Sequence, residues 1–138
     1  FQIEFPDYDP STMPAMPAGF EDSSWHNDSC PSFTNSALQL IIYVDYLDPA
    51  QRALGGDSNR FIIQKLDSEG SLTGEFPVVA TDAWQTVLVF LGEMDAPALN
   101  DWYESTVGYR PQVDDPTMSD DELRQLCKEY VEARYGEG

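Results

Sequence analysis

Alternating apolar residues mark the clearest strand of the chain, ALQLIIYVDY at residues 37–46. Both faces of this segment are largely apolar, which indicates a central strand that is covered on at least part of both sides. RFIIQKL at residues 60–66 predicts a second strand, and the Asp-Ser-Glu-Gly sequence at 67–70 predicts a turn after it. A third strand is expected near residues 76–80. Pro77 favours an edge position for that strand, because proline has no amide hydrogen to donate to a neighbouring strand.

Helical signals occur both between and after the strands. Between the first two strands, Asp48 and the proline after it predict a short helical turn that Gly55 can close. Further along, apolar residues recur at i, i+3, i+4 and i+7, which is typical of a helix face that packs on a core. A second, weaker helix is expected to begin at Pro97. The sequence SDDE at 119–122 is a capping box, and it predicts a final helix that ends near Gly136. The apolar positions of the helix expected before Pro97 are Trp84, Val87, Leu88 and Leu91.

Residues 1–35 differ from the rest of the chain. Five prolines prevent a regular helix, and six large aromatic residues are spread among them. A disordered tail rarely carries so many large apolar groups, so we expect an extended arm whose aromatic side chains hold it against the core. These aromatic residues are Phe1, Phe5, Tyr8, Phe20, Trp25 and Phe33.

The order of arm, three strands and three helices predicts an α+β fold. We expect a small antiparallel sheet of three or four strands packed by two to three helices, with residues 109–118 as a loop. A length of 138 residues fits a single domain over 1–138, in which the arm 1–35 packs on the core. The longest apolar run, Val87–Leu91, is far shorter than the about 20 residues of a membrane span. No association with membranes and a cytoplasmic location are therefore expected.

Acidic residues dominate the charge of the chain, with 25 Asp and Glu against 7 Lys and Arg and a formal net charge of −18. Such a surface repels phosphate groups, which argues against direct nucleic acid binding and against anionic membranes. A basic protein partner suits it. The charge is also compatible with a nucleic-acid mimic that occupies a DNA-binding protein, although the acids are spread along the chain without a continuous stripe. Adaptation to a salty environment is a further explanation of the same composition.

The stretch WHNDSCPSF at residues 25–33 collects the most reactive side chains, and it holds the single histidine of the chain. His26 and Cys30 could form a nucleophile–base pair, with Asp28 as a third polar group. Most residues around them favour turns, and a residue that precedes proline avoids the helical region, so the spacing of His26 and Cys30 does not align them on a helix. A turn that fixes the arm to the first strand explains the stretch without any chemistry.

Metal and cofactor signatures are missing from the sequence. A structural zinc site needs four ligands in short paired spacings, whereas Cys30 and Cys127 lie far apart. The acids between residues 114 and 121 lack the spacing of a calcium loop, and no P-loop, GxGxxG, GxSxG, HExxH or CxxC motif occurs. We therefore expect no metal and no cofactor. Cys127 lies on the apolar face of the final helix, and both thiols are expected to be reduced.

Three functions of different classes follow from the sequence. The first is a non-enzymatic protein-interaction module, with a partner surface formed by Trp25, His26, Tyr8 and Phe20. The second is a nucleic-acid-mimicking inhibitor of a DNA-binding protein. The third is a small enzyme or ligand binder that uses His26 and Cys30, and a pocket that joined these two residues would support it.

Overall fold

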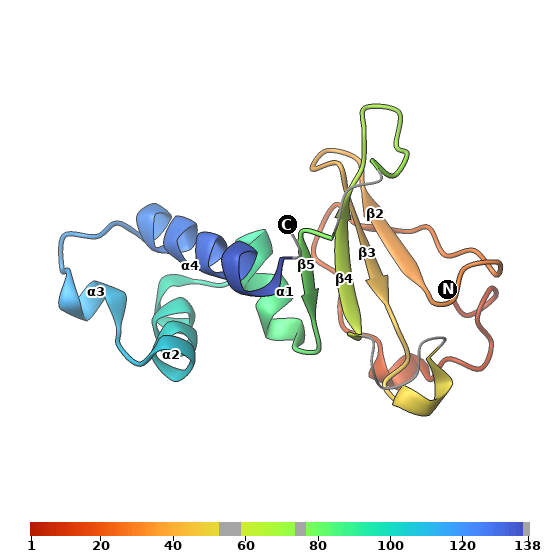
Figure 1. The fold of residues 1–138 in the computed structure, drawn as a ribbon, viewed down its shortest axis with the longest axis horizontal. Helices are drawn as coiled ribbons and strands as arrows, with labels where there is room; N and C mark the ends of the chain where they lie inside the picture. The colour runs from red at the N-terminus through yellow and green to blue at the C-terminus, as the bar shows by residue number, and fades with distance from the viewer. Residues whose placement is uncertain (53–58, 74–76, 137–138) are drawn as a thin grey trace. The chain divides into compact units, whose positions relative to one another are not determined.

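The computed structural model describes residues 1–52, 59–73 and 77–136 (Figure 1). Gly55 and Phe76, which two of the predictions above include, lie outside the described residues. By their internal contacts the described residues form two compact units, one from Phe1 to Trp84 together with Gly136, and the other from Gln85 to Tyr135. That the whole chain behaves as one domain stays a prediction.

The first unit is built on a five-stranded antiparallel sheet in which each strand pairs with the next one along the chain. Figure 1 labels four of these strands, β2 to β5. Helices follow the sheet in the sequence, so the predicted α+β class is confirmed. The sheet has one strand more than the three or four predicted. The strands are β1 (Glu21–Asp22), β2 (Ser32–Asn35), β3 (Leu40–Val44), β4 (Phe61–Lys65) and β5 (Val79–Thr81).

The two strands that the sequence did not predict, β1 and β2, lie inside the segment expected to be an extended arm. β2 reads Ser-Phe-Thr-Asn, which carries little hydrophobic signal, yet Ser32 is 1% exposed and Asn35 is 5% exposed. Pairing with β3 makes it a strand, since Phe33 lies opposite Ile42 in the ladder. The environment across the sheet therefore overrides the weak local preference. The arm also contains a short 3-10 helix, η1 (Pro10–Thr12).

The β2–β3 turn corrects the start of the first predicted strand. Residues 37–39 were expected to be extended, but β3 begins only at Leu40. The Asn35 side chain stabilises the turn, since its Oδ1 accepts a hydrogen bond of 3.0 Å from the Leu38 amide. Gln39 completes the turn with a backbone φ of 54°, in the left-handed region that residues other than glycine rarely adopt.

Strands β3 and β4 supply the centre of the core. Ile42 lies opposite Ile63 and Val44 lies opposite Phe61, and none of these four side chains is more than 1% exposed. The predicted strands at 37–46 and 60–66 are thus confirmed over most of their length. β5 lies at one edge of the sheet, as Pro77 predicted. A second short 3-10 helix, η2 (Pro49–Gln51), begins where Asp48 caps it.

The second unit is helical, and the first residue of its first helix belongs to the sheet unit. The three predicted helices are confirmed, and a further single-turn helix occurs within residues 109–118, which were expected to be a loop. No helix among the described residues has both the length and the apolar character needed to cross a membrane. The helices are α1 (Trp84–Leu91), α2 (Ala96–Val107), α3 (Pro111–Asp114) and α4 (Asp120–Tyr135).

Side-chain caps define the ends of the longer helices. Asp95 Oδ1 accepts a hydrogen bond of 3.1 Å from the Ala98 amide at the start of α2, and Gly108 ends that helix with φ of 113°. The capping box of α4 is present in both directions. Ser119 Oγ accepts from the Glu122 amide at 3.1 Å, and Glu122 Oε1 accepts from the Ser119 amide at 3.4 Å. These caps satisfy amides that have no partner inside the helix.

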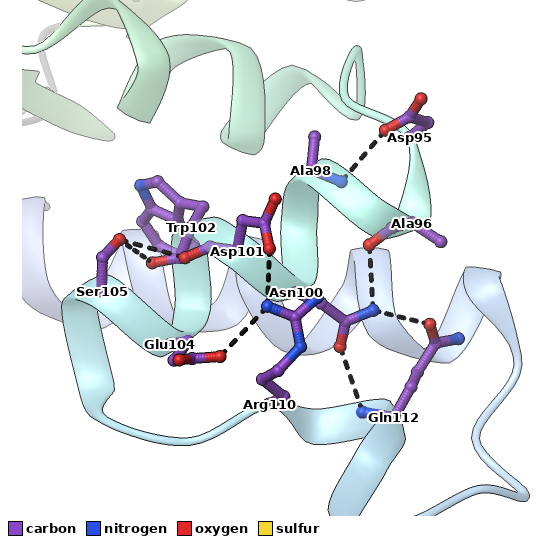
Figure 2. A network of polar contacts seen from close by, with 10 residues as sticks. All are labelled: Asp95, Ala96, Ala98, Asn100, Asp101, Trp102, Glu104, Ser105, Arg110 and Gln112. Atoms are coloured by element: carbon purple, nitrogen blue, oxygen red, sulfur yellow. Dashed lines mark hydrogen bonds and ion pairs between the residues drawn. The ribbon is translucent and has the colours of Figure 1, made fainter.

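A polar network joins α2 to α3 and explains the unexpected helix (Figure 2). Asn100, which is 7% exposed, donates to Gln112 Oε1 at 2.8 Å and accepts from the Gln112 amide at 3.2 Å. Arg110 Nη1 reaches back to Asp101 at 2.5 Å and to Glu104 at 3.0 Å. Contacts across the α2–α3 connection therefore hold a helical turn that no local periodicity indicates.

Candidate functional site

The stretch with the single histidine forms a turn, as the sequence predicts, and not a helix. The Asp28 amide donates to the Trp25 carbonyl at 2.9 Å, which closes this turn. Four residues of spacing in such a turn do not place His26 and Cys30 on one face. The two side chains instead have different environments, one exposed and one buried.

His26 lies at the surface beside the start of the chain. Its side chain is 62% exposed, and its Nδ1 lies 2.9 Å from Oε2 of Glu4. The ring of Trp25 is centred 6.1 Å from the imidazole in an edge-on arrangement, and Trp25 is 55% exposed. Ile3, the residue before Glu4, is 94% exposed. We call the three residues that these contacts link, Glu4, Trp25 and His26, the Trp25 surface.

Cys30 is buried, with 5% of its surface exposed. Burial raises the pKa of its thiol to about 12, and the negative charges of Asp45 and Asp28 act in the same direction. The thiol is therefore protonated at neutral pH, and a protonated thiol is a poor nucleophile. Among the described contacts of His26 there is a hydrogen bond to Glu4 and none to Cys30. This arrangement lacks the nucleophile–base contact of a catalytic pair.

The other predicted site residues are distributed differently. Asp28 is exposed and Phe20 is half-buried. Tyr8 lies in the core with 2% exposure, which corrects the expectation that it contributes to a partner surface. Its hydroxyl is engaged inside the unit, since it donates to the Asp45 carbonyl at 3.1 Å and accepts from Arg60 at 3.0 Å. The aromatic residues of the arm therefore differ in environment, since Tyr8 is buried in the core and Trp25 is exposed to solvent.

Arg60 is a buried charged residue with a structural role that the sequence analysis did not predict. It is 9% exposed, and its guanidinium donates to the Thr12 carbonyl at 2.6 Å and to the Asp45 carbonyl at 3.2 Å. It thus ties the N-terminal arm to β3 and β4. Burial raises the pKa of the Asp45 carboxyl, and the hydrogen bond from the Tyr46 amide together with the positive charges of Arg52 and Arg60 opposes this. The only sequence signal is a charged residue at the start of an apolar strand.

No group of three or more metal-ligating side chains occurs among the residues that the structure describes. Hollows formed by described residues of the sheet unit include one of about 200 Å³ beside Gln39 and one of about 220 Å³ beside Tyr46. Neither is lined by His26 or Cys30.

Comparison with known proteins adds no functional assignment. No protein-family model, curated protein or solved structure matches this chain.

Proposed function

We propose that the protein is a non-enzymatic interaction module that binds a basic protein segment through the Trp25 surface. The observation that carries this proposal is the indole of Trp25, which is 55% exposed at a fixed turn. Tryptophan is enriched among the residues that contribute most to protein–protein affinity.

The backbone on both sides of Trp25 is held in place, which lowers the entropy lost on binding. Before it, the Ser24 amide donates to Asp22 Oδ1 at 2.9 Å, and Ser24 Oγ accepts from the Ser32 amide at 3.1 Å. After it, the Asp28 amide closes the turn on the Trp25 carbonyl. The indole therefore projects from a segment that is anchored to β2.

Charge supports a basic partner. Glu21 is exposed in the edge strand β1, and Asp28 is exposed in the turn that follows Trp25. A lysine or arginine side chain could then contact both a carboxylate and the face of the indole, an interaction worth about 0.5–2 kcal/mol for the ring alone. Attraction over longer range also speeds encounter with a cationic partner.

The test is capture of partners from a lysate of the source organism with three matched baits. These are the wild-type protein, Trp25→Ala, and Leu38→Ala, which removes a side chain of similar exposure (53%) from the β2–β3 turn. We expect a basic protein to be recovered by the wild type and by Leu38→Ala, and to be lost with Trp25→Ala. Equal recovery with all three baits would refute a role for the Trp25 surface.

Salt distinguishes the alternatives in the same experiment. Capture at about 0.15 M and about 1 M salt separates screened charge contacts from apolar ones. A DNA-binding protein that is lost at high salt, but is insensitive to Trp25→Ala, would favour the nucleic-acid mimic instead. If the partner is retained at high salt and lost with Trp25→Ala, the affinity comes mainly from apolar contact with the indole of Trp25.

A further inference from the structure

We propose that His26 makes the Trp25 surface sensitive to pH, so that protonation of its imidazole weakens the binding of a basic partner. This inference rests on the proposed function, because it concerns the regulation of the same surface. Its basis is the position of the single histidine of the chain, which contacts a carboxylate and lies beside the exposed indole. Histidine is the side chain whose unperturbed change of charge falls between about pH 5 and pH 8.

Protonation of His26 changes the charge that a partner meets at this surface. The imidazole Nδ1 lies 2.9 Å from Oε2 of Glu4, and a neutral imidazole can donate a hydrogen bond from this nitrogen to the carboxylate. In that state the pair carries the negative charge of Glu4. When both ring nitrogens of His26 hold a proton, the positive charge of the ring cancels that of the carboxylate. The pair then has no net charge to attract a cation.

The imidazole is close enough to the indole for its charge to act on a bound cation. The centres of the two rings are 6.1 Å apart, and a cation that stacks on an indole lies within about 6 Å of the ring centre. The separation of the rings is shorter than the Debye length of about 8 Å at physiological ionic strength. Because the His26 side chain is 62% exposed, water weakens the repulsion. Two unit charges at such distances on a solvated surface change an affinity about twofold to tenfold.

The other charged groups beside this surface are carboxylates and one amino group. Glu4 contacts His26 from the N-terminal segment, and Asp28 is exposed in the same turn as His26. Carboxylates at the surface of proteins ordinarily titrate below about pH 5. The Phe1 amino group pairs with the carboxylate of Asp22. A variant that lacks the imidazole keeps all of these groups, so it isolates the contribution of His26.

The experiment measures the binding of a peptide whose own charge does not change with pH. An acetylated and amidated peptide of four Arg-Gly repeats is suitable, because guanidinium groups stay protonated throughout. A peptide of four Gln-Gly repeats with the same ends is the uncharged comparison. Each peptide is titrated into the ¹⁵N-labelled protein at about pH 5.5 and about pH 7.5, in about 0.02 M salt to limit screening. The indole signal of Trp25 and the amide signals of residues 21–28 report binding.

We expect the wild type to bind the arginine peptide about twofold to tenfold more weakly at the lower pH. His26→Gln keeps a hydrogen-bonding side chain but cannot gain a proton in this range, so its affinity should be the same at both pH values. Leu38→Ala, outside the surface, should keep the pH dependence of the wild type. Because binding and protonation are linked, the peptide should also lower the protonated fraction of His26 at about pH 6.5. The carbon-bound protons of this single imidazole report that fraction.

Three results would overturn the inference. Binding that depends on Trp25 but is equally strong at both pH values would refute the effect of pH and leave the proposed function standing. A pH dependence that persists in His26→Gln would assign it to another group, such as the Asp45 carboxyl, whose pKa burial raises. The absence of saturable binding at either pH, or binding that survives Trp25→Ala, would refute the proposed function and this inference with it.

Discussion

Replacing Arg60 by methionine tests whether one buried cation holds the N-terminal arm to the sheet. Methionine keeps the length and the apolar stem of arginine but removes the guanidinium. In the wild type this group donates to the Thr12 carbonyl, the Asp45 carbonyl and the Tyr8 hydroxyl at 2.6, 3.2 and 3.0 Å. It also lies 4.9 Å from the centre of the Phe61 ring. The variant removes all of these interactions together.

The magnitude follows from the hydrogen bonds that the guanidinium makes. Three hydrogen bonds from a charged donor disappear, and each contributes about 1 kcal/mol or more. The Asp45 carbonyl keeps the Tyr8 hydroxyl as a donor, so the Thr12 carbonyl is the acceptor most affected. We therefore expect Arg60→Met to lower the free energy of unfolding by ~3 kcal/mol. Arg60→Lys keeps the charge but cannot reproduce the planar fork of donors, so it should recover only part of this loss.

The assay is urea unfolding followed by tryptophan fluorescence and by far-ultraviolet circular dichroism. With a urea dependence of about 1–3 kcal/mol per molar, the loss lowers the unfolding midpoint by about 1–3 M. Lys65→Met is the matched control, because it removes a positive charge from an exposed position of β4. The control should change the unfolding free energy by less than about 0.5 kcal/mol.

One result would refute the reasoning about Arg60. If Arg60→Met unfolds within about 0.5 kcal/mol of the wild type, the guanidinium does not anchor the arm. Full recovery of stability by Arg60→Lys would refute a narrower point, namely that the geometry of the fork matters beyond its charge.

Three further predictions concern caps, thiols and pH. Ser119→Ala should lower the free energy of unfolding by about 1 kcal/mol, because α4 loses its cap. Ser105→Ala, inside α2, should be nearly neutral in the same urea assay, and equal effects of the two variants would contradict a capping role for Ser119. Cys30 and Cys127, which are 5% and 0% exposed, should react with a thiol reagent only through opening of the fold, and modification at the rate of the urea-unfolded chain would contradict their burial. The pKa of the Asp45 carboxyl is raised in the folded state, so the contribution of this carboxyl to stability falls as pH rises from about 4 through the raised pKa. When urea midpoints are measured against pH, Asp45→Asn should therefore lose less stability than the wild type over this range. Parallel curves for the two proteins would contradict a raised pKa of Asp45.

The three longer helices and the two central strands follow from the sequence because their signals are local. An apolar period of two or of about 3.6 residues is readable within a short window. The capping box at Ser119 and Glu122 and the edge position of β5 were likewise predictable, since a hydroxyl three residues before a carboxylate and a proline without an amide hydrogen act within their own segment.

The tertiary structure decided what depends on a distant partner. β2 is a strand because β3 lies beside it, and α3 is a helical turn because Asn100 and Arg110 hold it. The candidate site shows the same division. The sequence singled out Trp25 and His26 for their chemistry, but only packing decides that Trp25 is exposed while Tyr8 is buried. Whether a side chain is buried depends on residues far along the chain that pack against it. A local sequence pattern therefore does not predict it.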